Sequence, residues 1–337
     1  MDEQRLYALL DQASEWLAQG DLVRAERLIA KASKIAPEDP ELLSLKASVA
    51  SETGRSEDAI ALWERASAAA PDWVDPILSA ADEELEAFGD AQSCLRRIEP
   101  LIDHESPEVR GEVQLLRARA FVELEDERGA LAALEALAAT PFEGGELTLD
   151  ASDIAITLGR PELAERWLRG ALDRDPEDLD VVHALGLVLR EKGALDEMAA
   201  CWLRVRAADL GGPRPRWHLR DDEIEACMVK ALEELPAEVH VHLRNVPLFV
   251  EDAPSEALIR EGVDPRLLGL FTGTPLPDKT IGSSPSAPDA AYVFARNLEN
   301  VCESREAMLE EIRVTVLHET AHFFGLDDEQ LAELGLD

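Results

Sequence analysis

The spacing of apolar and polar positions changes about two thirds of the way along the chain. Up to about residue 210, apolar residues recur at the spacing of amphipathic helices arranged in pairs. The stretch Gly211-Gly212-Pro213-Arg214-Pro215 then breaks the helical pattern. Shorter apolar runs follow it, and some of them alternate with polar residues as strands do. The pattern predicts a helical part, a linker, and a smaller part that mixes helices and strands.

The helical part repeats itself with a period of 34 residues. Each repeat has a glycine suited to the turn between two helices, a small residue where the helices cross, and a proline where the second helix ends. The strongest repeats carry Gly20, Ala25 and Pro37, then Gly54, Ala59 and Pro71, then Gly159, Ala164 and Pro176, followed by Gly193, Met198 and Leu210. Weaker repeats lie around Gly89 and around Asp126, Ala130 and Pro141.

This period and these positions resemble the tetratricopeptide repeat family, over about residues 1–210 in six units. The family's early aromatic and Leu-Gly positions are mostly missing, and Ala184-Leu185-Gly186 is their nearest trace. The resemblance implies an all-α solenoid in which each helix pair buries its apolar face against its neighbours. It also implies a protein partner bound by the array. We expect the tryptophans of these helices to pack between them.

Beyond the linker at 211–216, the chain predicts an α+β domain over residues 217–337. A helix is expected over 222–235 and a last long helix over 304–324, which Ser304 would cap. Between these helices lie four strand candidates and a long loop rich in glycine, proline and serine. The strand candidates are 239–243, 246–250, 267–271 and 291–295, and the loop is 272–288.

The end of the last helix reads His318-Glu319-Thr320-Ala321-His322-Phe323-Phe324-Gly325-Leu326-Asp327. Residues four apart stack on one helix face, so His318 and His322 can offer two imidazoles to one metal ion. Glu319 then lies where it can reach a metal-bound water. Gly325 suits a left-handed turn that would bring Asp327 back as a third ligand. Two imidazoles, one carboxylate and an open position form a catalytic Zn²⁺ site.

Other readings of these residues remain open. A solvated helix with two surface histidines fits poorly, because the helix is apolar around the motif. Asp328 competes with Asp327 for the place of the third ligand, and His240 and His242 lie on one face of a predicted strand, where they could also bind the metal.

The order of elements around the motif resembles the minimal zincin-like metallopeptidases of bacteria. The resemblance rests on the segments 245–254 and 267–276 and on the motif of 318–328. It implies a small zincin fold, hydrolysis of a peptide or protein substrate, His318, His322 and Asp327 as Zn²⁺ ligands, and Glu319 as general base. A Met-turn of the metzincin type is absent after Asp327. The substrate strand is expected to pair with segment 291–295 as a sheet edge, again by resemblance.

Charge narrows the choice of partners. Asp and Glu number 70 against 33 Lys and Arg, a formal net charge of −37. Such a surface repels phosphate backbones and anionic lipid, so neither a nucleic acid nor a membrane is an expected partner. The beginning of the chain lacks a secretory signal, and the four cysteines form no close pairs, which predicts a cytoplasmic protein with reduced thiols.

Two functions are therefore in competition. In the first, the chain is a zinc metallopeptidase whose repeats recruit its protein substrate or a partner. In the second, it is an adaptor whose zincin-like domain is inactive. The presence of Glu319 favours the enzyme, because a purely structural metal site needs no base.

Overall fold

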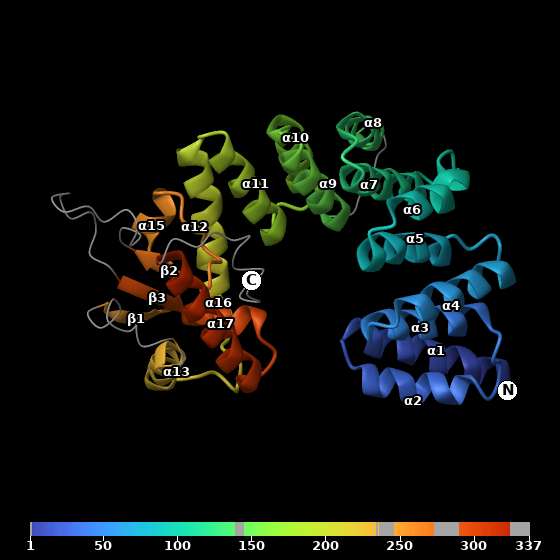
Figure 1. Ribbon diagram of the computed structural model, residues 1–337, viewed down its shortest axis with the longest axis horizontal. Helices are drawn as coiled ribbons and strands as arrows, with labels where there is room; N and C mark the ends of the chain where they lie inside the picture. Colours follow the sequence, from blue (N-terminus) through green and yellow to red (C-terminus); the bar gives the residue numbers. More distant parts are fainter. Residues whose placement is uncertain (1, 139–144, 234, 236–245, 273–289, 324–337) are drawn as a thin grey trace. The chain divides into compact units, whose positions relative to one another are not determined.

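The computed structural model describes residues 2–138, 145–233, 235, 246–272 and 290–323. The predicted strand at 239–243, the predicted loop and the residues that follow Phe323 lie outside this description. The chain forms two compact units, Met1–Val181 and Val182–Asp337. Figure 1 shows their elements along the chain.

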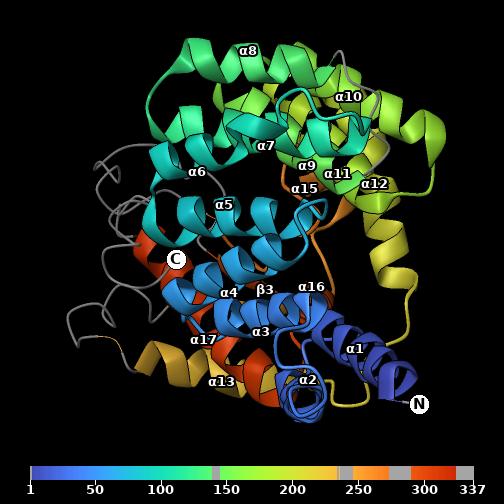
Figure 2. The same ribbon diagram turned by 90° about the vertical axis from the view of Figure 1, so that its right-hand side faces the viewer.

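The first unit consists of helices that follow one another in pairs. Their bounds are α1 Asp2–Ala18, α2 Leu22–Ala32, α3 Pro40–Glu52, α4 Ser56–Ala69, α5 Asp75–Phe88, α6 Ala91–Ile98, the 3-10 helix η1 Glu99–Leu101, α7 Pro107–Glu123, α8 Glu127–Ala138, α9 Gly145–Thr157 and α10 Pro161–Arg174. Seen from the side, the pairs α1/α2 and α3/α4 lie against each other, and α5 follows (Figure 2). The predicted all-α tetratricopeptide-type solenoid is confirmed.

The turn inside each helix pair explains the 34-residue period. The residue that reverses the chain has a positive φ, for example +73° at Gly20 and +71° at Gly54. Glycine tolerates this conformation because it has no Cβ. In the pair α7/α8 the sequence offers no glycine, and Glu125 takes the position with a φ of 54°. The 34-residue repeat is hard to recognise in this part of the sequence, because the turn keeps its positive φ although a glutamate stands where the other repeats have glycine.

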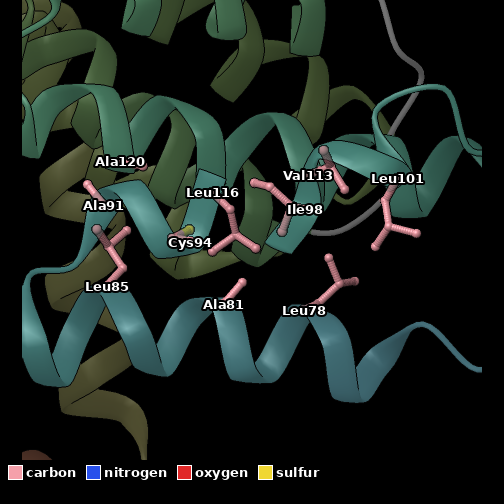
Figure 3. Packing of buried hydrophobic residues seen from close by; sticks show 10 residues of the cluster. All are labelled: Leu78, Ala81, Leu85, Ala91, Cys94, Ile98, Leu101, Val113, Leu116 and Ala120. Atoms are coloured by element: carbon pink, nitrogen blue, oxygen red, sulfur yellow. The ribbon is translucent and has the colours of Figure 1, made fainter. Parts of the chain in front are cut away.

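The core of the array forms between neighbouring pairs. Figure 3 shows one such cluster, in which α5 and α6 meet the next helix, α7. Its buried members are Leu78, Ala81, Leu85, Ala91, Cys94, Ile98, Leu101, Val113, Leu116 and Ala120. Small alanines let the helices approach, and the larger aliphatic side chains fill the space between them. Burial raises the pKa of the Cys94 thiol to about 12, so this cysteine is an inert packing residue.

The second unit begins at Val182, inside α11 (Leu179–Glu191), and continues with α12 (Leu195–Gly211). These two helices pack closely because Gly186 has no side chain. A Cβ on Gly186 would lie 2.0 Å from Nε1 of Trp202. The Nε1–H group of Trp202 donates to the carbonyl of His183 at 3.1 Å. Trp202 is fully buried, as expected for a packing residue.

A three-stranded sheet forms the centre of the C-terminal part. The remaining elements of the unit are α13 Asp221–Glu233, β1 Leu248–Glu251, α15 Glu256–Arg260, β2 Gly269–Thr272, β3 Ala290–Phe294, α16 Ala295–Val301 and α17 Arg305–Phe323. The strand order is β1-β3-β2, with β1 parallel and β2 antiparallel to β3. The predicted strands at 246–250, 267–271 and 291–295 are thus present within one or two residues. One face of the sheet packs on α13 and α17 through a single apolar cluster.

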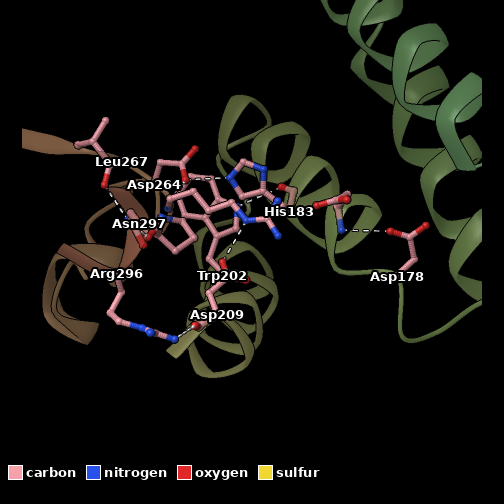
Figure 4. A network of polar contacts seen from close by, with 11 residues as sticks. Asp178, His183, Trp202, Asp209, Asp264, Leu267, Arg296 and Asn297 are labelled. Atoms are coloured by element: carbon pink, nitrogen blue, oxygen red, sulfur yellow. Dashed lines mark hydrogen bonds and ion pairs between the residues drawn. The ribbon is translucent and has the colours of Figure 1, made fainter. Parts of the chain in front are cut away.

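The helix pair α11/α12 is tied to the C-terminal part by polar contacts (Figure 4). His183 Nε2 lies 2.8 Å from Oδ1 of Asp264. The Arg266 guanidinium donates to Asp209 at 3.1 Å. The buried Arg296 donates to the carbonyl of Asp209 at 3.1 Å and to that of Gly212 at 2.8 Å. Residues Asp209 and Gly212, at the start of the predicted linker, are therefore hydrogen-bonded to Arg266 and Arg296 of the C-terminal part.

These contacts bear on the predicted division into 1–210, 211–216 and 217–337, which stays a prediction. We expect a fragment that begins at Asp178, whose side chain caps α11, to unfold at a temperature at least about 10 °C above a fragment that begins at Arg216. The shorter fragment loses the partners of Asp264 and Arg266 and the packing of α12. Thermal unfolding followed by circular dichroism measures the difference. Equal midpoints would show that the linker is the true boundary.

Candidate metal centre

Helix α17 carries the motif and is anchored at its other end. The Ser304 hydroxyl accepts a hydrogen bond from the amide of Ala307 at 3.1 Å, which confirms the predicted cap. Met308, Ile312 and Val316 follow at helical spacing and are buried in the cluster with α13 and the sheet. The helix is thus fixed along its length, and its last turns bring the motif to the sheet.

Glu319 reaches the side of β2 that faces away from β3. The amide of Phe271 donates to Oε2 of Glu319 at 2.8 Å. The carbonyl of Leu268 accepts from the amide of Phe294, so the alternation of an antiparallel ladder turns the amides of Gly269 and Phe271 away from β3. Within the described sheet, β2 is an edge strand. The Glu319 carboxylate therefore accepts from a β2 amide that points away from β3.

The absence of a side chain at Gly269 brings β2 close to α17. A Cβ at this position would lie 2.4 Å from Cγ2 of Thr315 and 3.3 Å from Cγ of Glu319. The first distance is shorter than any that real Cβ atoms adopt, so the two elements approach this closely only with glycine here. The sequence contained this signal, a glycine inside a predicted strand, but nothing in its spacing showed which helix the strand would meet.

The surroundings of Glu319 on the core side are apolar. A cavity of about 10 Å³, room for about one water molecule, lies beside its side chain. Its lining comes from α13, α17 and the three strands, and includes Met228, Leu248, Phe271, Val316 and Thr320. Bulk water is thus kept from the core side of the carboxylate.

The described residues contain part of the predicted ligand set. His318 is half-buried on α17, one residue before Glu319. His322 lies one turn further along the same continuous helix, and its side chain is outside the description. Asp327, Asp328, His240 and His242 also lie outside the described residues. Among the described side chains, no group of three or more His, Cys, Asp or Glu is placed to hold a metal ion.

The residues present fit a zinc site on the evidence of the helix itself. The backbone of α17 continues as helix without a break through positions 318 and 322, which keeps the four-residue spacing typical of paired histidine ligands. None of the four cysteines, all of them in the described part of the chain, is in a disulfide bond. Cys227 donates to the carbonyl of Leu309 at 3.3 Å and packs between α13 and α17.

One expectation about the sheet is wrong. Segment 291–295 was expected to form an edge for a substrate strand, but β3 is the central strand, with β1 and β2 on its two sides. Within the described sheet, the edge strand that Glu319 contacts is β2. Apolar runs identify strands but not their order in a sheet, because order depends on contacts between distant segments.

Two groups that support the site were not recognised in the sequence. Asn297 donates from its side-chain amide to the carbonyls of Pro265 and Leu267, both at 2.7 Å, and so fixes the segment just before β2. His183, whose sequence surroundings show no partner pattern, binds Asp264 in the same segment. The pKa of the Asp264 carboxyl lies below its ordinary value. Burial opposes this shift, and the hydrogen bond and charge of His183 outweigh it.

We expect Gly269→Ala to destabilise the C-terminal unit by about 1–3 kcal/mol, because its Cβ overlaps the Thr315 methyl. Combining it with Thr315→Ala should recover part of this loss, and urea unfolding of the single and double variants measures the coupling. Gly170→Ala is the matched control, since Gly170 is helical with nothing near its Cβ position, and it should stabilise. Additive effects of the first two substitutions would contradict the close approach.

Comparisons with known proteins agree with both parts of the chain. The model of the family described as zincin-like metallopeptidase matches residues 243–336, and a tetratricopeptide repeat model matches residues 17–81. The chain thus carries a zincin-like metallopeptidase domain after a tetratricopeptide repeat array. No curated protein matches the chain. In the described residues no helix has the length and apolar character needed to cross a membrane.

Solved structures similar to this chain include tetratricopeptide repeat proteins. A thermophilic repeat protein from Thermus thermophilus is 20% identical, with a TM-score of 0.47 over 55% of this chain and 98% of its own. PilF of Pseudomonas aeruginosa is 13% identical, with a TM-score of 0.48 over 63% of this chain and 95% of its own. A repeat protein from Parabacteroides merdae is 17% identical, with a TM-score of 0.42 over 71% of this chain and 97% of its own.

Proposed function

We propose that the chain is a zinc-dependent metallopeptidase that hydrolyses peptide bonds, and that its repeat array recruits a protein substrate or partner. The observation that carries the proposal is the position of Glu319. Its carboxylate contacts β2, an edge strand of the described sheet, and lies beside His318 and one turn before His322 on the same helix. The match of residues 243–336 to the zincin-like metallopeptidases supports it.

His318, His322 and Asp327 would hold the Zn²⁺ ion. When bound there, the ion would lower the pKa of its water toward neutrality and polarise the scissile carbonyl. The two imidazoles must be neutral to act as ligands. Because the helix is anchored in the core through Met308, Ile312 and Val316, its histidines need no large rearrangement of the backbone to act as ligands.

Glu319 acts as general base. It accepts a proton from the attacking water and passes it to the leaving amine. The Phe271 amide binds Oε2 and fixes the orientation of the carboxylate, and the bond uses only one of its two oxygens. The apolar lining on its core side keeps bulk water away from that side. The base is thus held at the edge of the sheet rather than on a mobile loop.

The edge of β2 gives the substrate a place to lie. The amide and carbonyl of Gly269 face away from β3 and can pair with an extended peptide, as exposed strands do in other peptide complexes, while the Phe271 amide is already engaged by Glu319. A peptide bound in this way passes directly beside Glu319, because that carboxylate touches the same edge. Pairing through backbone hydrogen bonds does not depend on the side chains of the peptide. Selection among substrates must therefore come from other contacts, including those of the repeat array.

We expect Glu319→Gln to retain zinc and the fold but to lose hydrolysis by about 10²–10⁴-fold, because the amide cannot take the proton. His322→Ala should instead lose zinc. Glu306→Gln, the same change at an exposed position near the start of α17, is the control and should leave both unchanged. Metal content and turnover of a quenched peptide library measure these effects. Undiminished cleavage by Glu319→Gln would remove the proposed base.

The adjacent aspartates make a separate prediction about the third ligand. The family pattern places the residue two past Gly325 at the metal, so Asp327→Ala should weaken zinc binding strongly and abolish activity. Asp328→Ala should cost much less. Zinc titrations of both variants against a competing chelator decide between them. A larger loss from Asp328→Ala would reverse the assignment, and no loss from either would point to His240, His242 or another acid.

The adaptor alternative has a distinct outcome. An inactive zincin-like domain would take up zinc or fold normally, yet wild type and Glu319→Gln would show the same absence of turnover on every peptide. Partner binding by the array would then be the whole function. The Glu319 carboxylate, held by β2 next to His318, favours the enzyme, because a structural metal site has no need of a base there.

A further inference from the structure

The array contains a groove that helices α5, α7 and α9 line together, with a volume of about 230 Å³. Its floor is apolar and consists of Leu78, Leu115, Leu116 and Leu147. Leu78 and Leu116 belong to the cluster of Figure 3, so the floor is part of the packed core and keeps its shape. The groove is therefore a preformed hollow with room for a long side chain.

The rim of the groove carries an excess of negative charge. Asp82, Glu112 and Asp150 contribute three carboxylates and Arg119 contributes one guanidinium, so the formal charge of the lining residues is −2. Arg119 is itself engaged by two acids, Asp82 through one nitrogen and Glu86 through the other at 2.6 Å. Its charge is therefore already balanced before a ligand arrives.

Glu112 shows the imbalance most clearly. Its side chain is half-buried at the rim, and the described residues place no cation in ion-pair contact with it. Burial, and then the charge of Asp75, raise the pKa of its carboxyl. Burial also raises the pKa of Asp82, although Arg119 opposes this. A cation in the groove would lower the pKa of both carboxyls again, because a nearby positive charge favours the ionised carboxylate.

We propose that this groove binds a peptide segment of a protein partner through a lysine or arginine side chain of that segment. The aliphatic stem of such a side chain lies on the leucine floor, and its charged end meets the carboxylates of Glu112 and Asp150. A second copy of the chain does not fit as the general source of this ligand, since each copy carries a net charge of −37.

The inference rests on the recruiting role proposed for the array and names the chemistry of what is recruited. It does not depend on hydrolysis. A binding measurement can fail while the enzyme still cleaves short peptides, and the enzyme can be inactive while binding succeeds. The two failures are therefore distinguishable.

The experiment uses the full chain and a fluorescein-labelled peptide of five Leu-Lys repeats, with the matching Leu-Glu peptide as its counterpart. Fluorescence anisotropy in about 0.15 M salt measures the dissociation constant, since screening at this salt suppresses long-range attraction. We expect the double variant Glu112→Gln/Asp150→Asn to raise the dissociation constant at least about fivefold. The Leu-Glu peptide should not bind.

Two further variants separate the groove from the general acidity of the chain. Glu99→Gln/Glu135→Gln removes the same charge at exposed positions outside the groove and should change the constant less than about twofold. Ser79→Tyr fills the groove without changing charge and should weaken binding as much as the groove double variant. Helical circular dichroism must stay unchanged. Equal losses in the two double variants, full binding by Ser79→Tyr, or no binding to wild type would each overturn the proposal.

Discussion

The contact between α17 and the edge of β2 is the constraint on which the proposed chemistry depends. It consists of a hydrogen bond from the Phe271 amide to Glu319 and of the missing side chain at Gly269. The hydrogen bond orients the carboxylate, and the glycine allows the helix and the strand to approach. A single added methyl group at Gly269 would push the helix that carries both histidines away from the strand that would bind the substrate.

This contact is in turn supported by the last helix pair of the array. Asn297 fixes the segment before β2, and His183 binds Asp264 in that segment from α11. The Arg296 guanidinium donates to the carbonyls of Asp209 and Gly212 at the C-terminal end of α12. Residues that belong to the repeats by sequence period therefore help to place the strand beside Glu319. Within the second unit, the last repeat is a structural part of the candidate site.

Local features were predictable from the sequence because local physics determines them. The repeat turns follow from glycine at positive φ, and the start of α17 follows from the Ser304 cap. The helices at 222–235 and 304–324 and the strands at 246–250, 267–271 and 291–295 were placed within a few residues by the spacing of apolar positions, whereas the short helices α15 and α16 were not predicted. The order of the strands and the partners of His183 and Asn297 were not predictable. Such contacts join residues far apart in the chain, and no periodicity records them.

The central claim is that the histidines of α17 hold a catalytic zinc ion, and X-ray absorption at the zinc edge of the zinc-loaded full chain tests it most directly. We expect a first shell of nitrogen and oxygen at about 2.0–2.1 Å with the outer scattering of two imidazole rings. His322→Ala, loaded as far as it allows, should show the loss of one ring. A sulfur shell at about 2.3 Å, or a chain that takes up no zinc, would contradict the account.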